Sequence, residues 1–222
     1  LAEKIEPIKD RTDKVLEFRK NAGTRAKTAI GRPHKFAWIN KPRDTQIIIP
    51  TVSSERREYI PVGFLGNNTI VSNSASIVHN PEPYIFGIIS SRMHKQWVLA
   101  VAGRLRTDIR YTSSICYNTF PFPNISKNRV QEINQCVFRI LDEREKHAEK
   151  SIAELYDPES MPIGLKEAHH ANDEVIEKCY RSRPFESDTQ RLEYLFKLYE
   201  EMIQAEKEKD SLFEKKKKNR RR

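Results

Sequence analysis

Cysteine and glycine are scarce in this chain of 222 residues, and no long apolar run occurs. The three cysteines, Cys116, Cys136 and Cys179, stand far apart, without a CxxC pair or a Cys–His cluster. This spacing predicts neither a zinc site nor a disulfide framework, and it favours a reducing, cytoplasmic location. Because no stretch of about 18 apolar residues occurs, no membrane-spanning helix is expected.

Motifs for catalysis and cofactor binding are also missing. No glycine-rich loop follows a predicted strand, so no site for a nucleotide or a methyl donor is indicated. The string NPEPY at 80–84 comes nearest to the Asn/Asp-Pro-Pro-aromatic loop of amino methyltransferases, but Glu82 breaks its Pro-Pro turn. The six histidines lack metal-ligand spacing and are expected at the surface or at helix caps. We therefore expect no catalytic residue, metal or cofactor within this chain.

No signal peptide precedes the first predicted helix, and the chain begins at Leu1, so we expect a fragment of a longer protein. Its net charge of +9 is distributed unevenly. Residues 1–125 hold 19 Lys and Arg against 10 Asp and Glu, whereas residues 126–214 hold 14 against 21. Seven basic residues and no acid fall in the tail, 215–222. This asymmetry predicts a polyanion-facing front part, an acidic scaffold behind it, and a disordered basic tail.

Residues 1–125 mix helical and strand patterns. Helices are expected at 8–31 and 83–102, where apolar residues recur at helical spacing. Apolar runs bounded by turn-forming residues predict strands at 46–50, 58–65, 69–71, 76–78 and 115–119. Pro61 predicts an edge strand at 58–65, because proline has no backbone N–H to donate to a neighbouring strand.

Residues 126–214 are predicted to be helical throughout. Ser126 is a good N-cap, and SDTQ at 187–190 fits a capping box. Three amphipathic helices with short loops predict a small bundle that also packs on the front part. The expected fold class is α+β, with a mixed α/β domain at 1–125, a helical domain at 126–214 and the tail at 215–222.

The string RLRTDIRY at 104–111 is the most informative stretch of the front domain. Polar residues alternate with apolar or small ones, and period two is typical of a strand with one buried face. Four charged residues are then expected on one face: Arg104, Arg106, Asp108 and Arg110. In the major groove of DNA, Arg donates to guanine and Asp accepts from cytosine, so the last three are predicted base readers. A solvated face with cross-strand ion pairs is the alternative.

Other basic residues of the front domain are candidates for contacts to DNA phosphates. Such contacts fix the position of a protein on DNA without reading the sequence. The candidates are Arg56, Arg57, Arg92, Lys95 and Arg104. For each of them, a solvated surface position is the alternative interpretation.

Several strings, in one order along the chain, resemble a known protein family. In the front domain they are IIPTVSSERREYIP at 48–61, SSRMHKQW at 90–97, VAGRLRTDIRY at 101–111 and YNTFPFP at 117–123. In the helical region they are LYDP at 155–158 and LEYLFKLY at 192–199. Between residues 40 and 205 the chain thus resembles the MmeI-like type II restriction–modification enzymes and their adenine-N6 DNA methyltransferase relatives.

In that family a nuclease and an adenine-N6 methyltransferase precede a target recognition domain and a helical region, and this chain resembles the last two. The resemblance implies double-stranded DNA and the methyltransferase domain as partners, and a bacterial or archaeal cytoplasm as location. It implies S-adenosylmethionine in the parent protein and Mg²⁺ for any nuclease. It also places the specificity positions at Arg106, Asp108 and Arg110, where Arg106 stands in place of the commoner Lys.

Two other functions fit the composition. A module for RNA or single-stranded DNA would use the basic front part and its aromatic residues, and it would show little preference for duplex sequence. A protein-interaction scaffold would use the acidic helices, and it would bind nucleic acid only through the tail. An enzyme acting by itself is disfavoured, because no catalytic constellation is found.

Overall fold

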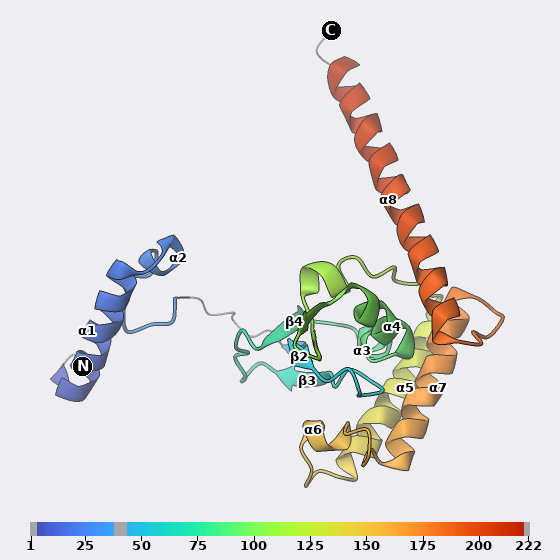
Figure 1. Cartoon of the computed structure of the whole chain (residues 1–222), viewed down its shortest axis with the longest axis horizontal. Helices are drawn as coiled ribbons and strands as arrows, with labels where there is room; N and C mark the ends of the chain where they lie inside the picture. Colours follow the sequence, from blue (N-terminus) through green and yellow to red (C-terminus); the bar gives the residue numbers. More distant parts are fainter. Residues whose placement is uncertain (1–3, 38–43, 220–222) are drawn as a thin grey trace. The chain divides into compact units, whose positions relative to one another are not determined.

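The computed structural model describes residues 4–37 and 44–219, with side chains up to Lys209. The chain divides into two compact units at residue 41 (Figure 1). The first unit contains helices α1 (Glu6–Asn21) and α2 (Thr24–Lys27). Extended backbone at Ala22 and Gly23 divides the helix that was predicted over 8–31.

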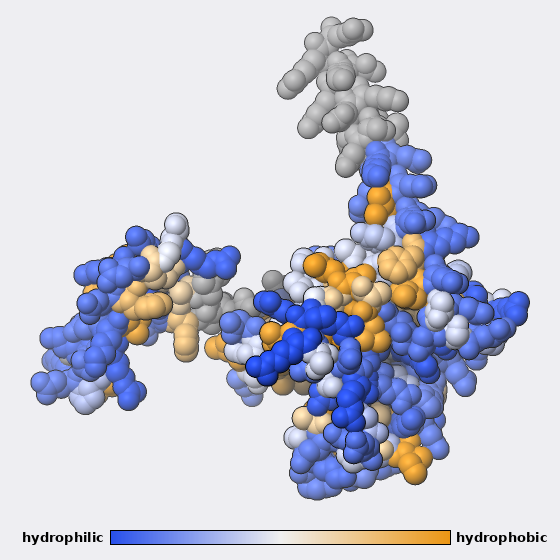
Figure 2. All heavy atoms as spheres, viewed as in Figure 1, coloured by the Kyte–Doolittle hydropathy of each residue, from blue (hydrophilic) through white to orange (hydrophobic). Residues whose placement is uncertain are grey.

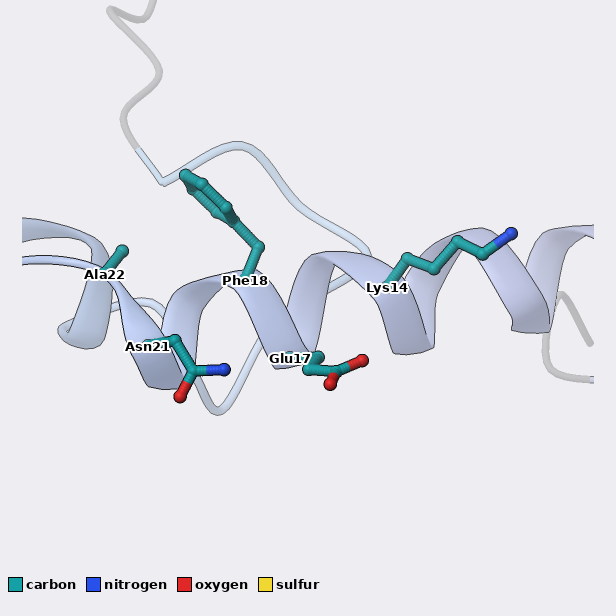
Figure 3. A pocket seen from close by; sticks show the side chains of 5 residues that line it. All are labelled: Lys14, Glu17, Phe18, Asn21 and Ala22. Atoms are coloured by element: carbon teal, nitrogen blue, oxygen red, sulfur yellow. The ribbon is translucent and has the colours of Figure 1, made fainter.

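Arg19 organises this first unit. Its guanidinium group donates to three carbonyl oxygens of the segment after α2, at distances of 2.7–2.9 Å: those of Ala29, Arg32 and Lys35. Phe18, one position earlier, is 69% exposed. Together with Lys14, Glu17, Asn21 and Ala22 it lines a shallow hollow on α1, where these side chains project from the helix (Figure 3).

The second unit begins with a three-stranded antiparallel sheet. Its strands are β1 (Thr45–Pro50), β3 (Gly63–Gly66) and β4 (Ala75–His79), in the order β3-β1-β4. The predicted strands at 46–50 and 76–78 are confirmed, and β3 is an edge strand as expected. The strand predicted at 58–65 begins only at Gly63, so residues 58–62 were wrongly assigned to it. The strand predicted at 69–71 is not formed. Pro61 explains the late start of β3, because it lacks the N–H that a ladder needs.

Two short helices follow where one long helix was predicted over 83–102. They are α3 (Pro83–Ile89) and α4 (Arg92–Val101). The break lies at Ser90 and Ser91. The Ser91 hydroxyl donates to the carbonyl of Ile88 at 2.7 Å and accepts the backbone N–H of His94 at 3.3 Å, so it ends one helix and caps the next.

A second sheet is formed by β2 (Val52–Ser53), β6 (Asp108–Arg110) and β5 (Gly103–Leu105), in that order. All its pairs are antiparallel. After β6, residues Ser113–Tyr117 form a π-helical turn, η2. The prediction of a strand at 115–119 was therefore wrong.

The described residues after 125 are mainly helical, as predicted, but they form four helices rather than three. The helices are α5 (Lys127–Glu145), α6 (Ile152–Leu155), α7 (Ile163–Tyr180) and α8 (Asp188–Asn219). Ser126 accepts the N–H of Arg129, which confirms the predicted cap. Ser187 accepts the N–H of Gln190, but the Gln190 side chain accepts the N–H of Glu186 rather than that of Ser187, so only half of the predicted capping box is formed. The α+β class is thus observed, while the domain boundary at residue 125 stays a prediction.

Helix α8 packs on α4 through its first turns. Trp97 of α4 lies 5.2 Å from the ring of Phe196 and 5.4 Å from that of Tyr199. Beyond Ile203 the side chains up to Lys209 are exposed, and Figure 2 shows that part as mainly hydrophilic. The helix continues to Asn219, so residues 215–219 of the tail that was predicted to be disordered are helical. No helix within the described ranges is long and apolar enough to span a membrane.

A buried polar cluster joins the strand-bearing segments to α7. Asp173 on α7 accepts the hydroxyl of Tyr59 and the backbone N–H of Arg92, both at 2.7 Å. Tyr59 also stacks on His169, with ring centres 4.2 Å apart. The guanidinium group of Arg92 in turn forms two hydrogen bonds, of 2.7 and 3.0 Å, with Asp188 at the start of α8. The first turn of α4 is thereby fixed to both α7 and α8.

Gly87 allows α3 to approach α5 and α7 closely. A Cβ atom there would lie 2.5 Å from Cγ2 of Ile133 and 2.9 Å from Oδ1 of Asn172. We expect Gly87→Ala to lower the free energy of unfolding by about 1–3 kcal/mol, measured by urea denaturation. Gly103→Ala is the control, because a Cβ there meets nothing within 4 Å. Equal effects of the two substitutions would contradict this packing.

Burial raises the pKa of Asp173 to about 7, against the opposing hydrogen bonds from Arg92 and Tyr59. A carboxyl group with a raised pKa takes up protons on folding, so its contribution to stability is lost as pH rises through that pKa. We expect the free energy of unfolding of the wild type, relative to Asp173→Asn, to fall between pH 3.8 and about 7. Urea denaturation across this range measures it, and a difference that rises or stays constant would contradict the prediction.

Candidate nucleic-acid interface

Residues 104–111 form a hairpin rather than the single strand that was predicted. β5 and β6 pair through Gly103 with Arg110, Arg104 with Ile109, and Leu105 with Asp108. Arg106 and Thr107 form the two-residue turn between them. Arg106 has a φ of 58°, which is uncommon for a residue other than glycine. A positive φ at the first turn position matches a type II′ turn, a common two-residue hairpin connection.

The hairpin also separates the charges that were expected on one face. Asp108 and Arg110 point outward, because the residue between them, Ile109, is 2% exposed and faces the core. Arg104 lies opposite Ile109 and hence on the inner side, where its guanidinium group pairs with Glu55 at 2.5 Å. Arg106 stands at the tip. The expectation of one common face was therefore wrong for Arg104 and for Arg106.

The three predicted base readers have unoccupied polar groups. In the part of the chain that the structure describes, no side-chain hydrogen bond or ion pair engages Arg106, Asp108 or Arg110. Arg106 and Arg110 are exposed, and Asp108 is partly exposed. Cross-strand ion pairs were the alternative for these charges, and none is formed among them. Their donors and acceptor are therefore available to a ligand without breaking an internal contact.

Most of the predicted phosphate contacts are engaged within the chain. Arg56, exposed, pairs with Glu159 at 2.8 Å. Arg57 donates to the carbonyl of Ala153 at 3.4 Å. Arg92 is held by Asp188, as described above, which raises the pKa of its guanidinium group. Arg57 thus contacts α6 and Arg92 contacts the start of α8, so both have a structural role whatever else they bind.

Lys95 is not at the surface. It is 4% exposed, and its ammonium group donates to the carbonyl oxygens of Glu55, at 3.2 Å, and of Arg57. Burial lowers its pKa to about 8, while nearby acidic groups including Glu58 oppose the shift. Lys95 thus holds the loop after β2 against α4, and its burial removes it from any surface that could meet a phosphate. Pattern alone could not show this, because residues 55 and 95 meet only in the fold.

Two of the histidines are buried, which corrects their expected place at the surface. Nε2 of His94 lies 3.1 Å from the hydroxyl of Tyr111, and burial lowers the pKa of His94 to about 3. Nε2 of His169 lies 2.6 Å from the hydroxyl of Tyr156, and its pKa is also well below the usual value. Both are neutral packing residues. Across 4–37 and 44–219, no group of three or more His, Cys, Asp and Glu side chains could hold a metal ion.

Comparisons with known proteins cover nearly the whole chain. The family described as the MmeI target recognition domain matches residues 1–124, and that described as the MmeI C-terminal domain matches residues 125–205. DNA methyltransferase A of Bacillus subtilis (strain 168) is 49% identical over 172 residues, which are 78% of this chain and 20% of that protein.

A solved structure is similar as well. It is the type IIL restriction–modification enzyme MmeI in complex with DNA, with 36% sequence identity and a TM-score of 0.84. The match covers 89% of this chain and 26% of that one. The chain therefore spans about a fifth to a quarter of the length of these relatives.

The turn of the hairpin has a consequence for stability that can be measured. Glycine adopts positive φ readily, whereas other residues in this region are strained by about 1–2 kcal/mol. We expect Arg106→Gly to raise the free energy of unfolding by about 1 kcal/mol in urea denaturation. Thr107→Gly is the control and is expected to give no gain, because Thr107 lacks a positive φ. A loss of stability in Arg106→Gly would contradict the turn.

Proposed function

The chain belongs to the MmeI family, and we propose that it is the module through which an adenine-specific DNA methyltransferase or restriction–modification enzyme recognises its target sequence. The family described as a target recognition domain covers residues 1–124. The observation that carries the proposal is the β5–β6 hairpin, which presents Arg106, Asp108 and Arg110 without internal partners. Unpaired charged groups on a projecting turn are suited to ligand contact.

The hairpin fits the major groove of double-stranded DNA. That groove admits a two-stranded β-ribbon and exposes a distinct pattern of donors and acceptors for each base pair. Arg106 at the tip donates to O6 and N7 of a guanine, and Asp108 accepts from N4 of a cytosine in the same or a neighbouring pair. Arg110, further from the tip on the same face as Asp108, reads another guanine or holds a phosphate.

Phosphate contacts come from the exposed basic residues around the hairpin. Arg56 and Arg104 pair with Glu159 and Glu55 in side chains that are 42–79% exposed, so water competes for both ion pairs. Exposed ion pairs contribute about 0–1 kcal/mol, and a phosphate can replace the carboxylate at little cost. Arg57 and Arg92 are further candidates, and Lys95 is not one.

The catalytic step lies outside this chain in this proposal. A methyltransferase domain of the longer protein would hold S-adenosylmethionine and flip the target adenine, while the hairpin selects the site. Any nuclease of that protein would require Mg²⁺. The partners proposed for this chain are thus double-stranded DNA and the methyltransferase domain, in a bacterial or archaeal cytoplasm.

Binding of RNA or single-stranded DNA is the second candidate. The basic front part would attract any polyanion, and exposed aromatic side chains such as Phe36, 78% exposed, could stack on bases. A competition experiment distinguishes this candidate. Single strands would then displace bound duplex at least as well as added duplex does. A protein-interaction scaffold would instead use the acidic helices and would bind nucleic acid only through the basic tail.

Base reading by the hairpin can be tested in the full-length protein that carries this chain. Methylated adenines are mapped in host DNA for the wild type, Arg106→Ala and Asp108→Ala. A bidentate base contact is worth about 1–3 kcal/mol, so discrimination at one base position should fall by about 5- to 150-fold in each variant. The other positions of the motif should persist.

The control is Phe138→Ala, at a position of α5 that is 54% exposed and lies outside the sheet of the hairpin. It should leave the motif and the methylation rate unchanged. An unaltered motif in Arg106→Ala and Asp108→Ala would refute base reading by the hairpin. Binding that single-stranded competitors abolish would favour the second candidate instead.

A further inference from the structure

The sheet of β2, β6 and β5 has an outer face that carries more than charges. Residues directly opposite each other in an antiparallel sheet point to the same side. Arg110 lies opposite Val52 on one side and opposite Gly103 on the other, and Asp108 lies opposite Leu105. These five residues therefore share the outer face. Two of them, Leu105 and Val52, are apolar and come from different strands.

Both apolar side chains are about half exposed rather than buried in the core. Leu105 is 50% exposed and Val52 is 41% exposed, and neither belongs to the core or packs against it within the described residues. In contrast, Ile109 on the inner face is buried. Exposed apolar surface gains nothing from folding, but it gains about 25 cal/mol per Å² when a ligand covers it. Such surface beside unpaired charges indicates contact with a ligand that has both polar and apolar groups.

The edges of the base pairs in the major groove have this mixed character. Guanine and cytosine offer acceptors and a donor there, and thymine alone adds an apolar group, its C5-methyl. We propose that Leu105 contacts the C5-methyl group of a thymine in the recognised sequence, and that Val52 extends the same apolar surface. This inference rests on the proposed function, because it needs the outer face to lie in the major groove.

The register fixes where that thymine lies. Opposite residues of an antiparallel pair have Cβ atoms about 4.5–5.5 Å apart, so Leu105 stands beside Asp108. Successive bases of one strand are about 3.4 Å apart along the helix axis. Leu105 therefore falls within about two base pairs of the pair that Asp108 reads. The sensitive thymine should lie within two positions of the one that changes in Asp108→Ala.

The test uses duplexes in which each thymine of the recognised sequence is replaced in turn by deoxyuridine, which removes only the methyl group. Methylation by the full-length protein is measured as kcat/KM on each duplex. The wild type should show a roughly three- to fivefold loss at one thymine, the size expected for one buried methyl group. Leu105→Ala should give equal rates with thymine and deoxyuridine there, whereas Leu105→Met should keep the difference. Phe138→Ala serves as the control and should keep it in full.

The outcomes separate this inference from the proposed function. If Asp108→Ala changes the recognised sequence but Leu105→Ala still distinguishes thymine from deoxyuridine, the methyl contact is refuted and base reading stands. A wild type that is insensitive to deoxyuridine at every thymine also refutes the contact. If neither Asp108→Ala nor Arg106→Ala changes the sequence, both proposals fail. Urea denaturation of Leu105→Ala checks that the hairpin is still folded.

Discussion

The buried carboxylate of Asp173 ties the strand-bearing part of the chain to its helices. It accepts one hydrogen bond from Tyr59, in the loop before β3, and one from the backbone of Arg92, the first residue of α4. Because α4 leads directly into β5, this contact determines where the base of the hairpin lies relative to α7. The hydrogen bonds of Lys95, one turn further along α4, hold the loop after β2 in the same frame.

Elements specified by local signals were predicted correctly. The apolar run at 46–50 became the central strand β1, and the serine caps at 126 and 187 begin α5 and α8. The errors arose where local and tertiary preferences differ. Two serines divide 83–102, and the turn at Arg106 and Thr107 contains no glycine, asparagine or proline that would mark it. Period two continues through that turn, so the alternation could not distinguish a hairpin from a strand.

The candidate site was predicted in its residues but not in its geometry. Arg106, Asp108 and Arg110 could be found from residue type and from family resemblance. The sequence could not show that these side chains lack internal partners, because that depends on which charged groups the fold brings near them. Glu55 and Arg104, 49 positions apart, pair only once β2 and β5 flank β6. The burial of Lys95 likewise follows from the packing of α4 rather than from its neighbours in sequence.

Neighbouring positions of β6 have different surroundings. Ile109 is buried in the core, whereas Asp108 is only partly buried and Arg110 is exposed, and neither belongs to the hydrophobic core. Substitutions at 108 and 110 can therefore accumulate during evolution with little effect on folding. Inserting or deleting one residue is different, because it would turn the isoleucine outward and a charge inward. Related proteins should therefore differ in the residues of this hairpin, while the number of residues in it stays the same.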